Sequence, residues 1–285
     1  MNYAELTFQD KNFIKRWLQR QRLVSAIKLS RKFTTLPNTI WVPRKIQIFF
    51  WEWQRDLKGS SLLKAAKWQL IEVPICDFQH SGQILDFGAG NGELCKLLSE
   101  TYQGSQIICY EPSHTLLSEA KENLKAFTQI EFCQDISNLT PQTFDAVFCL
   151  EVFEHLPPEE TIKALETIYD LLKSGGLLII GVPIEIGIPA LYKGLFRMSR
   201  RYGEFDADIK NIVNSFLMNP PQKRPISEIE PGLRFHYPHM GFDFRHLERE
   251  ISTYFSLCDI WTSPFVLPFG SWLMPEIYFA VKKLR

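Results

Sequence analysis

The chain has 285 residues and no net formal charge, because 32 Lys and Arg balance 32 Asp and Glu. This length allows one large domain, or one domain with a substantial appendage, and the hydrophobic content of 45% can fill a core. No apolar run is long enough to span a bilayer, which excludes a membrane-spanning bundle.

The cysteines and the first residues both bear on the compartment. Six cysteines are present, with no CxxC pair and no metal-ligand spacing, and several fall within predicted strands. Free cysteines of this kind act as small apolar residues and suit a reducing environment. The first residues are polar and acidic, unlike a signal peptide. We therefore expect a cytoplasmic protein.

Residues 1–80 differ in character from the rest, and we predict that they form a basic, aromatic-rich helical extension. Residues 1–83 hold 14 Lys and Arg but only 6 Asp and Glu, and five of the seven tryptophans precede residue 70. Residues 11–29 and 60–70 show helical periodicity, and the aromatic run 46–53 lies between them. Two roles stay open for this extension: a lid whose aromatics pack on the following domain, or a contact surface for substrate or membrane.

From residue 81 onward, strands and helices alternate, so we predict a second domain over 81–285. Strands are expected near 83–87, 106–111, 129–133, 144–150 and 177–182, and helices near 92–102, 114–126 and 158–173. Alternation of this kind indicates an α/β fold with a parallel sheet covered by helices on both faces. Two closing strands follow in 255–265 and 275–284, which makes seven, and residues 184–240 interrupt the pattern as an insertion.

A glycine turn directly follows the first of these strands. The run 84–92 reads ILDFGAGNG, in which Gly88, Gly90 and Gly92 alternate with other residues and Asp86 precedes them. Glycines let the backbone approach a ligand closely, and the helix that follows directs its N-terminal amides at the same place. Glu111, after the next strand, stands at the distance at which nucleotide-binding units place a ribose-binding acid. An anion at position 86 would repel a pyrophosphate but suits a ligand with an amino group.

This stretch resembles motif I of the class I S-adenosylmethionine (SAM) methyltransferases, and the resemblance continues in register over residues 80–183. FCQDIS, FDAVFCLEVFEHL and LLKSGGLLIIGVP look like the family's later motifs. The resemblance implies a Rossmann-like seven-stranded sheet and SAM as the cofactor. It also implies that Glu111 binds the ribose hydroxyls and that Asp135 and Ile136 contact the adenine. The full set of expected cofactor contacts is Asp86, Phe87, Gly88, Ala89, Gly90, Glu111, Asp135, Ile136 and Leu150.

The turn after the fourth strand supplies the candidate catalytic residues Glu151, Glu154 and His155. In a helical turn, residues at these spacings share one face. They would take the proton from an acceptor hydroxyl and position it, since SAM already carries an activated methyl group. The Glu-x-x-Glu-His pattern is similar to that of quinone-type O-methyltransferases and small-RNA methyltransferases, where it is associated with a divalent metal. We predict no resident metal here and keep the metal as the alternative.

Two further features lie in the insertion. His236 and His239 precede the last helix and could face the site, although a plain polar contact is the simpler interpretation. Residues 188–201 form a basic amphipathic pattern, with Lys193, Arg197, Arg200 and Arg201 on one face. Such a helix either covers the active site with its cations in water, or contacts an anionic membrane peripherally.

The preferred function is therefore SAM-dependent methyl transfer, with O-methylation favoured, to a small or lipid-like acceptor. A nicotinamide-dependent oxidoreductase, a non-catalytic SAM-binding protein and an RNA methyltransferase are the alternatives. We do not expect nucleic acid as a partner, since no recognised RNA-binding module is present.

Overall fold

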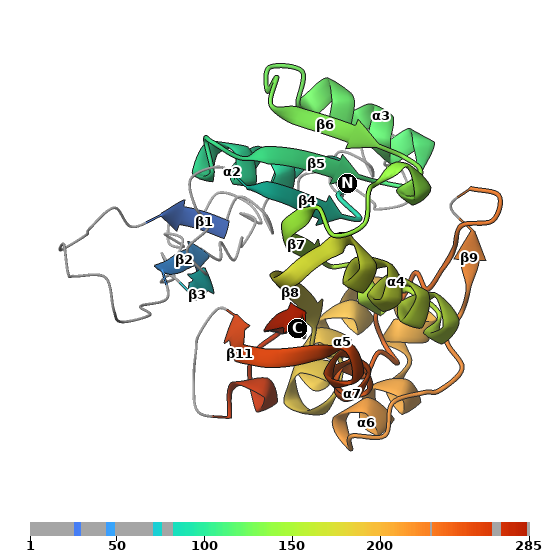
Figure 1. Cartoon of the computed structure of the whole chain (residues 1–285). Helices are drawn as coiled ribbons and strands as arrows, with labels where there is room; N and C mark the ends of the chain where they lie inside the picture. The colour runs from blue at the N-terminus through green and yellow to red at the C-terminus, as the bar shows by residue number, and fades with distance from the viewer. Residues whose placement is uncertain are drawn as a thin grey trace, which may run out of the picture. The chain divides into compact units, whose positions relative to one another are not determined.

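The computed structural model describes residues 26–29, 44–48, 71–75, 82–228, 230–263 and 269–283. The chain divides into two compact units, Met1–Ile75 and Cys76–Arg285. Figure 1 shows the whole chain with its helices and strands labelled.

The described part of the first unit is a small antiparallel sheet. Strands β1 (Ala26–Leu29), β2 (Arg44–Ile48) and β3 (Ile71–Ile75) follow in that order, and β2 pairs with both neighbours. The predicted helix over 11–29 is therefore wrong over its last four residues, because these form a strand that pairs with β2. The rest of that helix, and the helix predicted over 60–70, lie outside the described residues.

The second unit is built on a seven-stranded sheet. Its strands lie in the order β11-β12-β8-β7-β4-β5-β6. Their bounds are β4 (Gln83–Phe87), β5 (Gln106–Tyr110), β6 (Ile130–Cys133), β7 (Phe144–Leu150), β8 (Leu172–Pro183), β11 (Phe255–Ser263) and β12 (Glu276–Lys283). All pairs are parallel except those of β12, which runs antiparallel to β8 and to β11. This confirms the predicted seven-stranded, mostly parallel sheet.

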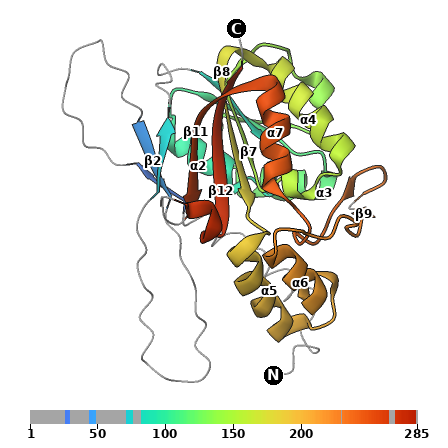
Figure 2. The ribbon, with the colours of Figure 1, turned by 90° about the horizontal axis from the view of Figure 1, so that it is seen from below.

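Helices connect these strands and cover both faces. They are α2 (Glu93–Thr101), α3 (His114–Asn123), α4 (Pro158–Leu171) and α7 (Phe244–Tyr254). The chain moves outward from β4 to β5 and β6, then returns to β7 and β8 on the other side of β4. Right-handed crossovers in opposite directions place their helices on opposite faces, as Figure 2 shows for α2 against α4 and α7. The order therefore reverses between β4 and β7, where open α/β sheets bind ligands.

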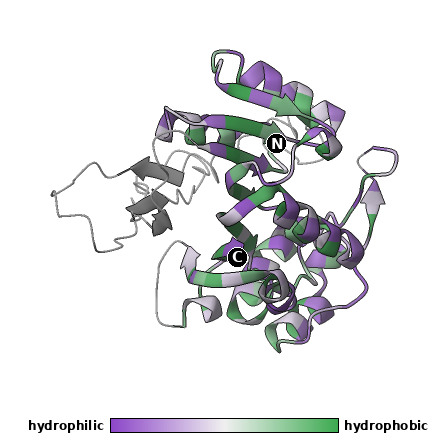
Figure 3. Cartoon of the chain, viewed as in Figure 1, coloured by the Kyte–Doolittle hydropathy of each residue, from purple (hydrophilic) through white to green (hydrophobic). Residues whose placement is uncertain are grey.

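Burial of both faces of the sheet explains why the strand sequences are continuous apolar runs. One face packs α4 and α7 through Leu165, Ile168 and Leu247 against Phe279 of β12. On α2, Leu94 and Leu98 are also buried, together with Leu117 of α3. Because both faces are covered, the strands need apolar residues at consecutive positions rather than at alternate ones. Figure 3 shows this concentration of apolar residues along the central strands.

The insertion after β8 has its own small architecture. It contains α5 (Gly187–Arg201), the short helix η4 (Phe205–Ala207), α6 (Ile209–Phe216) and a hairpin of β9 (Ser227–Glu228) and β10 (Arg234–Phe235). Helices α5 and α6 lie side by side (Figure 2). Three further single turns complete the domain: η2 (Ile136–Asn138), η3 (Phe153–His155) and η5 (Gly270–Trp272).

Candidate active site

The glycine turn after β4 adopts the conformation that its sequence demands. Gly88, Gly90 and Gly92 have φ of 79°, 56° and 85°, a region that L-residues with side chains rarely enter. The three glycines differ in what surrounds them. A Cβ on Gly88 would lie 2.6 Å from Val152, and one on Gly92 would lie 2.5 Å from Leu124, whereas one on Gly90 would meet nothing within 4 Å. Gly88 and Gly92 are therefore required by packing, and Gly90 leaves room beside the strand ends for a ligand.

The turn is fastened to the end of β5. The backbone N–H groups of Gly88 and Ala89 both donate to the Tyr110 carbonyl at 2.9 Å. Phe87, the last residue of β4, is buried, and its ring centroid lies 4.9 Å from that of Tyr110. These contacts hold the glycine turn against the residue that precedes Glu111.

Glu111 lies where the sequence places it, at the carboxyl end of β5. Its Oε2 accepts a hydrogen bond from the Gly90 N–H at 2.8 Å, and its Oε1 accepts one from the Ser113 N–H at 2.9 Å. Burial raises the pKa of Glu111, and the two amides partly offset that effect. Each carboxylate oxygen has a second lone pair, so this carboxylate can accept two ligand hydroxyls as well.

Asp86 is almost completely buried, 2% exposed, and its Oδ2 lies 3.1 Å from the Cys95 thiol. Burial raises its pKa to about 7, the Cys95 hydrogen bond opposes the rise, and the Glu111 charge adds to it. A buried carboxylate whose pKa lies near 7 is stabilised strongly by a nearby cation, because the cation favours the ionised form.

An open depression of about 590 Å³ lies at the ends of β5 and β6. Tyr110, Phe132, Asp135 and Ile136 are among the residues that line it. Asp135 begins η2 and accepts hydrogen bonds from the Ser137 N–H and hydroxyl, which lower its pKa. Both residues expected beside an adenine therefore border one open depression, whose lining combines aromatic and polar side chains.

The strand order reverses between β4 and β7, and the turn after β7 carries the expected catalytic residues. Glu154 is fully buried, and its Oε1 lies 3.8 Å from His155 Nε2. His239 reaches the same place from the insertion, with its ring centroid 4.8 Å from that of His155. Donor atoms of Glu154, His155 and His239 all lie within 4.8 Å of one another. A carboxylate with two imidazoles can work as an acid–base pair, or it can hold a divalent transition metal.

Glu151 does not share that helical turn. The turn η3 begins at Phe153, and Glu151 itself has a left-handed φ of 57°. The expectation that helical spacing aligns Glu151 with the other two is therefore wrong. The negative charge of Glu151 instead affects Tyr278. Burial raises the pKa of Tyr278 well above its ordinary value, and the charges of Glu276 and Glu151 raise it further. Leu150, the last residue of β7, pairs with Gly181.

Comparisons with known proteins identify the family of this domain. Residues 84–176 match the family described as "Methyltransferase domain". A ubiquinone biosynthesis O-methyltransferase of Xanthomonas campestris is 28% identical over 103 residues, 34% of this chain and 41% of that protein. A carboxy-S-adenosyl-L-methionine synthase of a Shewanella species is 26% identical over 150 residues, 48% of this chain and 62% of that protein. The chain carries a class I SAM-dependent methyltransferase domain.

Solved structures give a looser likeness. A Burkholderia thailandensis 1,6-didemethyltoxoflavin-N1-methyltransferase, crystallised with S-adenosylhomocysteine, covers 72% of each chain at 15% identity and a TM-score of 0.44. The curated relatives are matched over less than two thirds of their own length, so the match falls on the methyltransferase domain and leaves their remaining parts outside it.

Three residues that interact with the turn after β7 or with one another beside it were not found from the sequence. Tyr278 donates to Glu276 Oε2 at 3.0 Å and stacks on Trp261, with ring centroids 5.5 Å apart. Arg224 donates through Nη2 to the carbonyls of Glu154 and Pro238. These three, Tyr278, Glu276 and Arg224, lie far along the chain from the turn after β7. Tyr278 and Glu276 fall in the closing strand predicted over 275–284, and that prediction gave neither residue a role.

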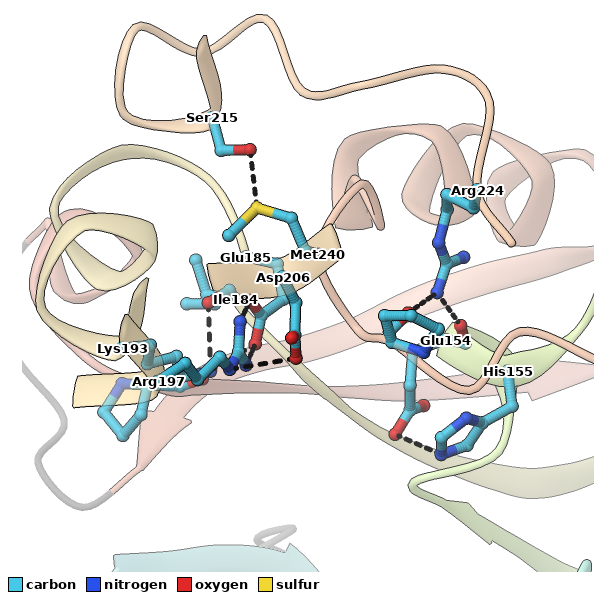
Figure 4. A network of polar contacts seen from close by, with 12 residues as sticks. Glu154, His155, Ile184, Glu185, Lys193, Arg197, Asp206, Ser215, Arg224 and Met240 are labelled. Atoms are coloured by element: carbon cyan, nitrogen blue, oxygen red, sulfur yellow. Dashed lines mark hydrogen bonds and ion pairs between the residues drawn. The ribbon is translucent and has the colours of Figure 1, made fainter. Parts of the chain in front are cut away.

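The basic face of α5 is also arranged differently from both sequence-based expectations (Figure 4). Arg197 makes a bidentate contact with Glu185, at 2.7 and 2.8 Å, and Lys193 joins the same carboxylate at 3.1 Å. Arg201 and Arg197 also approach Asp206. Burial alone would raise the pKa of Glu185, but Lys193 and Arg197 lower it well below its usual range. Lys193, Arg197 and Arg201 therefore point inward to buried acids, whereas Arg200 is exposed and lies over the Phe196 ring, 4.9 Å from its centroid.

Proposed function

We propose that this protein transfers the methyl group of SAM to a hydroxyl on a small, lipid-like acceptor. SAM supplies a methyl group already activated by its sulfonium. Gly90 would leave space for it, Glu111 would hold its ribose, Asp86 would lie toward its amino group, and the cavity beside Asp135 would take its adenine. The single observation that carries the proposal is the position of Glu154 and His155 one strand from that glycine turn, across the point where the strand order reverses.

The residues on the expected acceptor side support O-methylation. A hydroxyl must lose its proton as it attacks, and a buried carboxylate beside an imidazole can accept that proton. The side chains would also hold the acceptor in line with the reacting methyl group and keep water away. The named function of the Xanthomonas relative, an O-methyltransferase of ubiquinone biosynthesis, supports the same acceptor class.

The Shewanella relative suggests a second candidate, the synthesis of carboxy-SAM. That product bears an extra carboxylate at the transferred carbon, which needs a cation beside it. Here the expected acceptor side would carry Glu151 and Glu154, and the Nη2 of Arg224 already donates to two backbone carbonyls. This arrangement favours transfer of an uncharged methyl group.

The decisive experiment is incubation of the protein with SAM labelled in its methyl group and with separate lipid, metabolite and RNA extracts. We expect label in an alkali-stable product of the lipid or metabolite fraction, together with S-adenosylhomocysteine. Label in the RNA fraction alone would show that the acceptor is RNA and not a small, lipid-like molecule. Binding of S-adenosylhomocysteine without turnover in any fraction would favour a non-catalytic SAM-binding role, and binding of NAD alone would exclude the proposal.

The insertion supports a membrane as the source of the acceptor. No helix in the part of the chain that the structure describes is long and apolar enough to cross a bilayer. Lys193, Arg197 and Arg201 of α5 face inward, while large apolar side chains face outward beside Arg200, and Phe196 is 61% exposed. Trp272 of η5, 65% exposed, is close by, since the Tyr192 hydroxyl of α5 donates to the Leu273 carbonyl. The sequences of α5 and α6 contain no Asp or Glu.

Outward aromatic side chains on helices that carry no acids are the chemistry of an interfacial contact with lipid. We therefore expect peripheral binding by apolar insertion, which persists at high salt and on zwitterionic vesicles. Co-sedimentation with phosphatidylcholine vesicles tests this: Phe196→Glu and Trp272→Glu should release the protein, and Ser252→Glu, on the exposed side of α7, should not. Binding that requires anionic lipid and vanishes in high salt would show that charge, not apolar insertion, holds the protein.

A further inference from the structure

The last segment of the insertion, which leads into α7, contacts both the candidate cofactor side and the candidate acceptor side of the site. We call residues 224–228 and 230–239 the strap. Near its two ends the strap is fastened to the acceptor side, because Arg224 donates to the Glu154 carbonyl at 2.6 Å and the His236 N–H donates to the His155 carbonyl at 2.7 Å. His155 Nδ1 also lies 2.8 Å from the His236 carbonyl oxygen. The strap is therefore bound to the turn that carries the candidate catalytic residues.

The middle of the strap is fastened to the cofactor side. Glu230, between β9 and β10, accepts hydrogen bonds from the Ser113 hydroxyl at 2.7 Å and from the His114 and Thr115 N–H groups at 3.1 Å each. These donors begin α3, where an anion is favoured by the unpaired amides and by the helix dipole. They lower the pKa of Glu230 to about 2, so it is ionised at neutral pH. Figures 1 and 2 both show β9 reaching toward α3.

The contact is one step from the expected ribose acid. Ser113, whose hydroxyl donates to Glu230, also donates through its backbone N–H to Glu111 Oε1. The two carboxylates are near enough that the charge of Glu230 raises the pKa of Glu111. Glu230 thus holds the Ser113 hydroxyl and the backbone of the two residues after it, and the Ser113 N–H holds the Glu111 carboxylate.

We infer that Glu230 is a positioning residue for the nucleoside of the cofactor, and that the strap completes the ribose site from the insertion. This inference rests on the proposed function, since it assumes that Glu111 receives a ribose. It adds that the cofactor half-site is not finished within residues 82–183: an acid 119 positions after Glu111 sets its geometry. A pair of anions here also admits free ribose hydroxyls and rejects a ribose that carries a phosphate.

Calorimetric titration with S-adenosylhomocysteine tests the inference. Glu230→Ala should raise the Kd about tenfold, the equivalent of one charge-assisted hydrogen bond in preorganisation. Glu230→Gln keeps one acceptor oxygen but turns an amide toward an N–H donor. Its Kd should therefore lie between those of the unaltered protein and Glu230→Ala. Glu228→Ala is the matched control, because Glu228 lies on the same hairpin with an exposed side chain. It should bind as the unaltered protein does.

Steady-state kinetics separate positioning from a general loss of structure. Glu230→Ala should raise the KM for SAM and leave kcat at saturating SAM within about twofold, whereas a misfolded fraction would lower kcat alone. Equal Kd values for Glu230→Ala and the unaltered protein would overturn the inference. If the unaltered protein itself does not bind S-adenosylhomocysteine, the proposed function fails instead, so the two failures are distinguishable.

Discussion

Removing the Glu111 carboxylate should weaken cofactor binding by about 2–3 kcal/mol, or about 30–150-fold in Kd. Hydrogen bonds to charged groups each contribute on the order of 1.5–3 kcal/mol, and a ribose would present two donors. The sum is reduced because the oxygens of Glu111 already accept the Gly90 and Ser113 amides, so neither is wholly available to the ligand. Glu111→Ala also releases those amides into contact with water, which they can use as a partner.

The assay is isothermal titration of each folded variant with S-adenosylhomocysteine, with thermal melts of the unligated proteins as a check on folding. Glu111→Asp is the informative control, because it keeps the charge but withdraws the carboxylate by one methylene. It should recover part of the lost affinity. If Glu111→Ala binds as tightly as the unaltered protein, the ribose lies elsewhere and the assignment of the β5 acid is wrong.

Three other outcomes are expected. His155→Ala should cut kcat by about 10²–10⁴-fold with little change in S-adenosylhomocysteine affinity, and normal turnover of this variant would show that His155 takes no part in the chemistry. If a chelator abolishes the activity of the unaltered protein and a divalent metal restores it, Glu154, His155 and His239 hold an ion. Because the pKa of Asp86 is raised to about 7, its ionised form gains population as pH rises through 7. Affinity for a ligand with a cationic amino group should therefore increase between pH 6 and 8, and a flat profile, or the same profile in Asp86→Asn, would count against this. Gly90→Val should abolish binding while circular dichroism stays unchanged, since its side chain would enter open space at a φ of 56°; retained binding would move the ligand away from this turn.

The central sheet could be predicted from the sequence because its signals are local. Ile84 and Leu85 belong to a short apolar run, a glycine turn follows, and a helical pattern begins at once, so each strand is identified by its own neighbours. Residues 26–29 were misjudged because helical periodicity continues through them, whereas their strand is defined by pairing with β2, about twenty residues away. Pairing between distant segments leaves no mark on the periodicity of either one.

The acceptor side was predicted only in part for the same reason. The residues at 151–155 stand together in the sequence, so they were found, but the left-handed backbone at Glu151 could not be foreseen. The helical pattern of 188–201 revealed two faces without saying which one is buried. That choice is made by Glu185 and Asp206, which lie on either side of the helix in the chain and take its cations inward. Glu230 gave no signal, because the groups that donate to its carboxylate are more than 110 residues away.

The ion cluster beneath α5 has a consequence for how such a protein can diverge. Glu185, Lys193 and Arg197 hold the helix to the end of β8 by charge, and loss of one partner would strand a buried charge, which is among the costliest single changes in a folded protein. The outward residues, such as Leu195 and Phe196, take no part in that attachment. Mutation can therefore rewrite the exposed face while the helix stays in place. Descendants of this sequence could acquire new surfaces beside the acceptor edge without rebuilding the sheet that binds the cofactor.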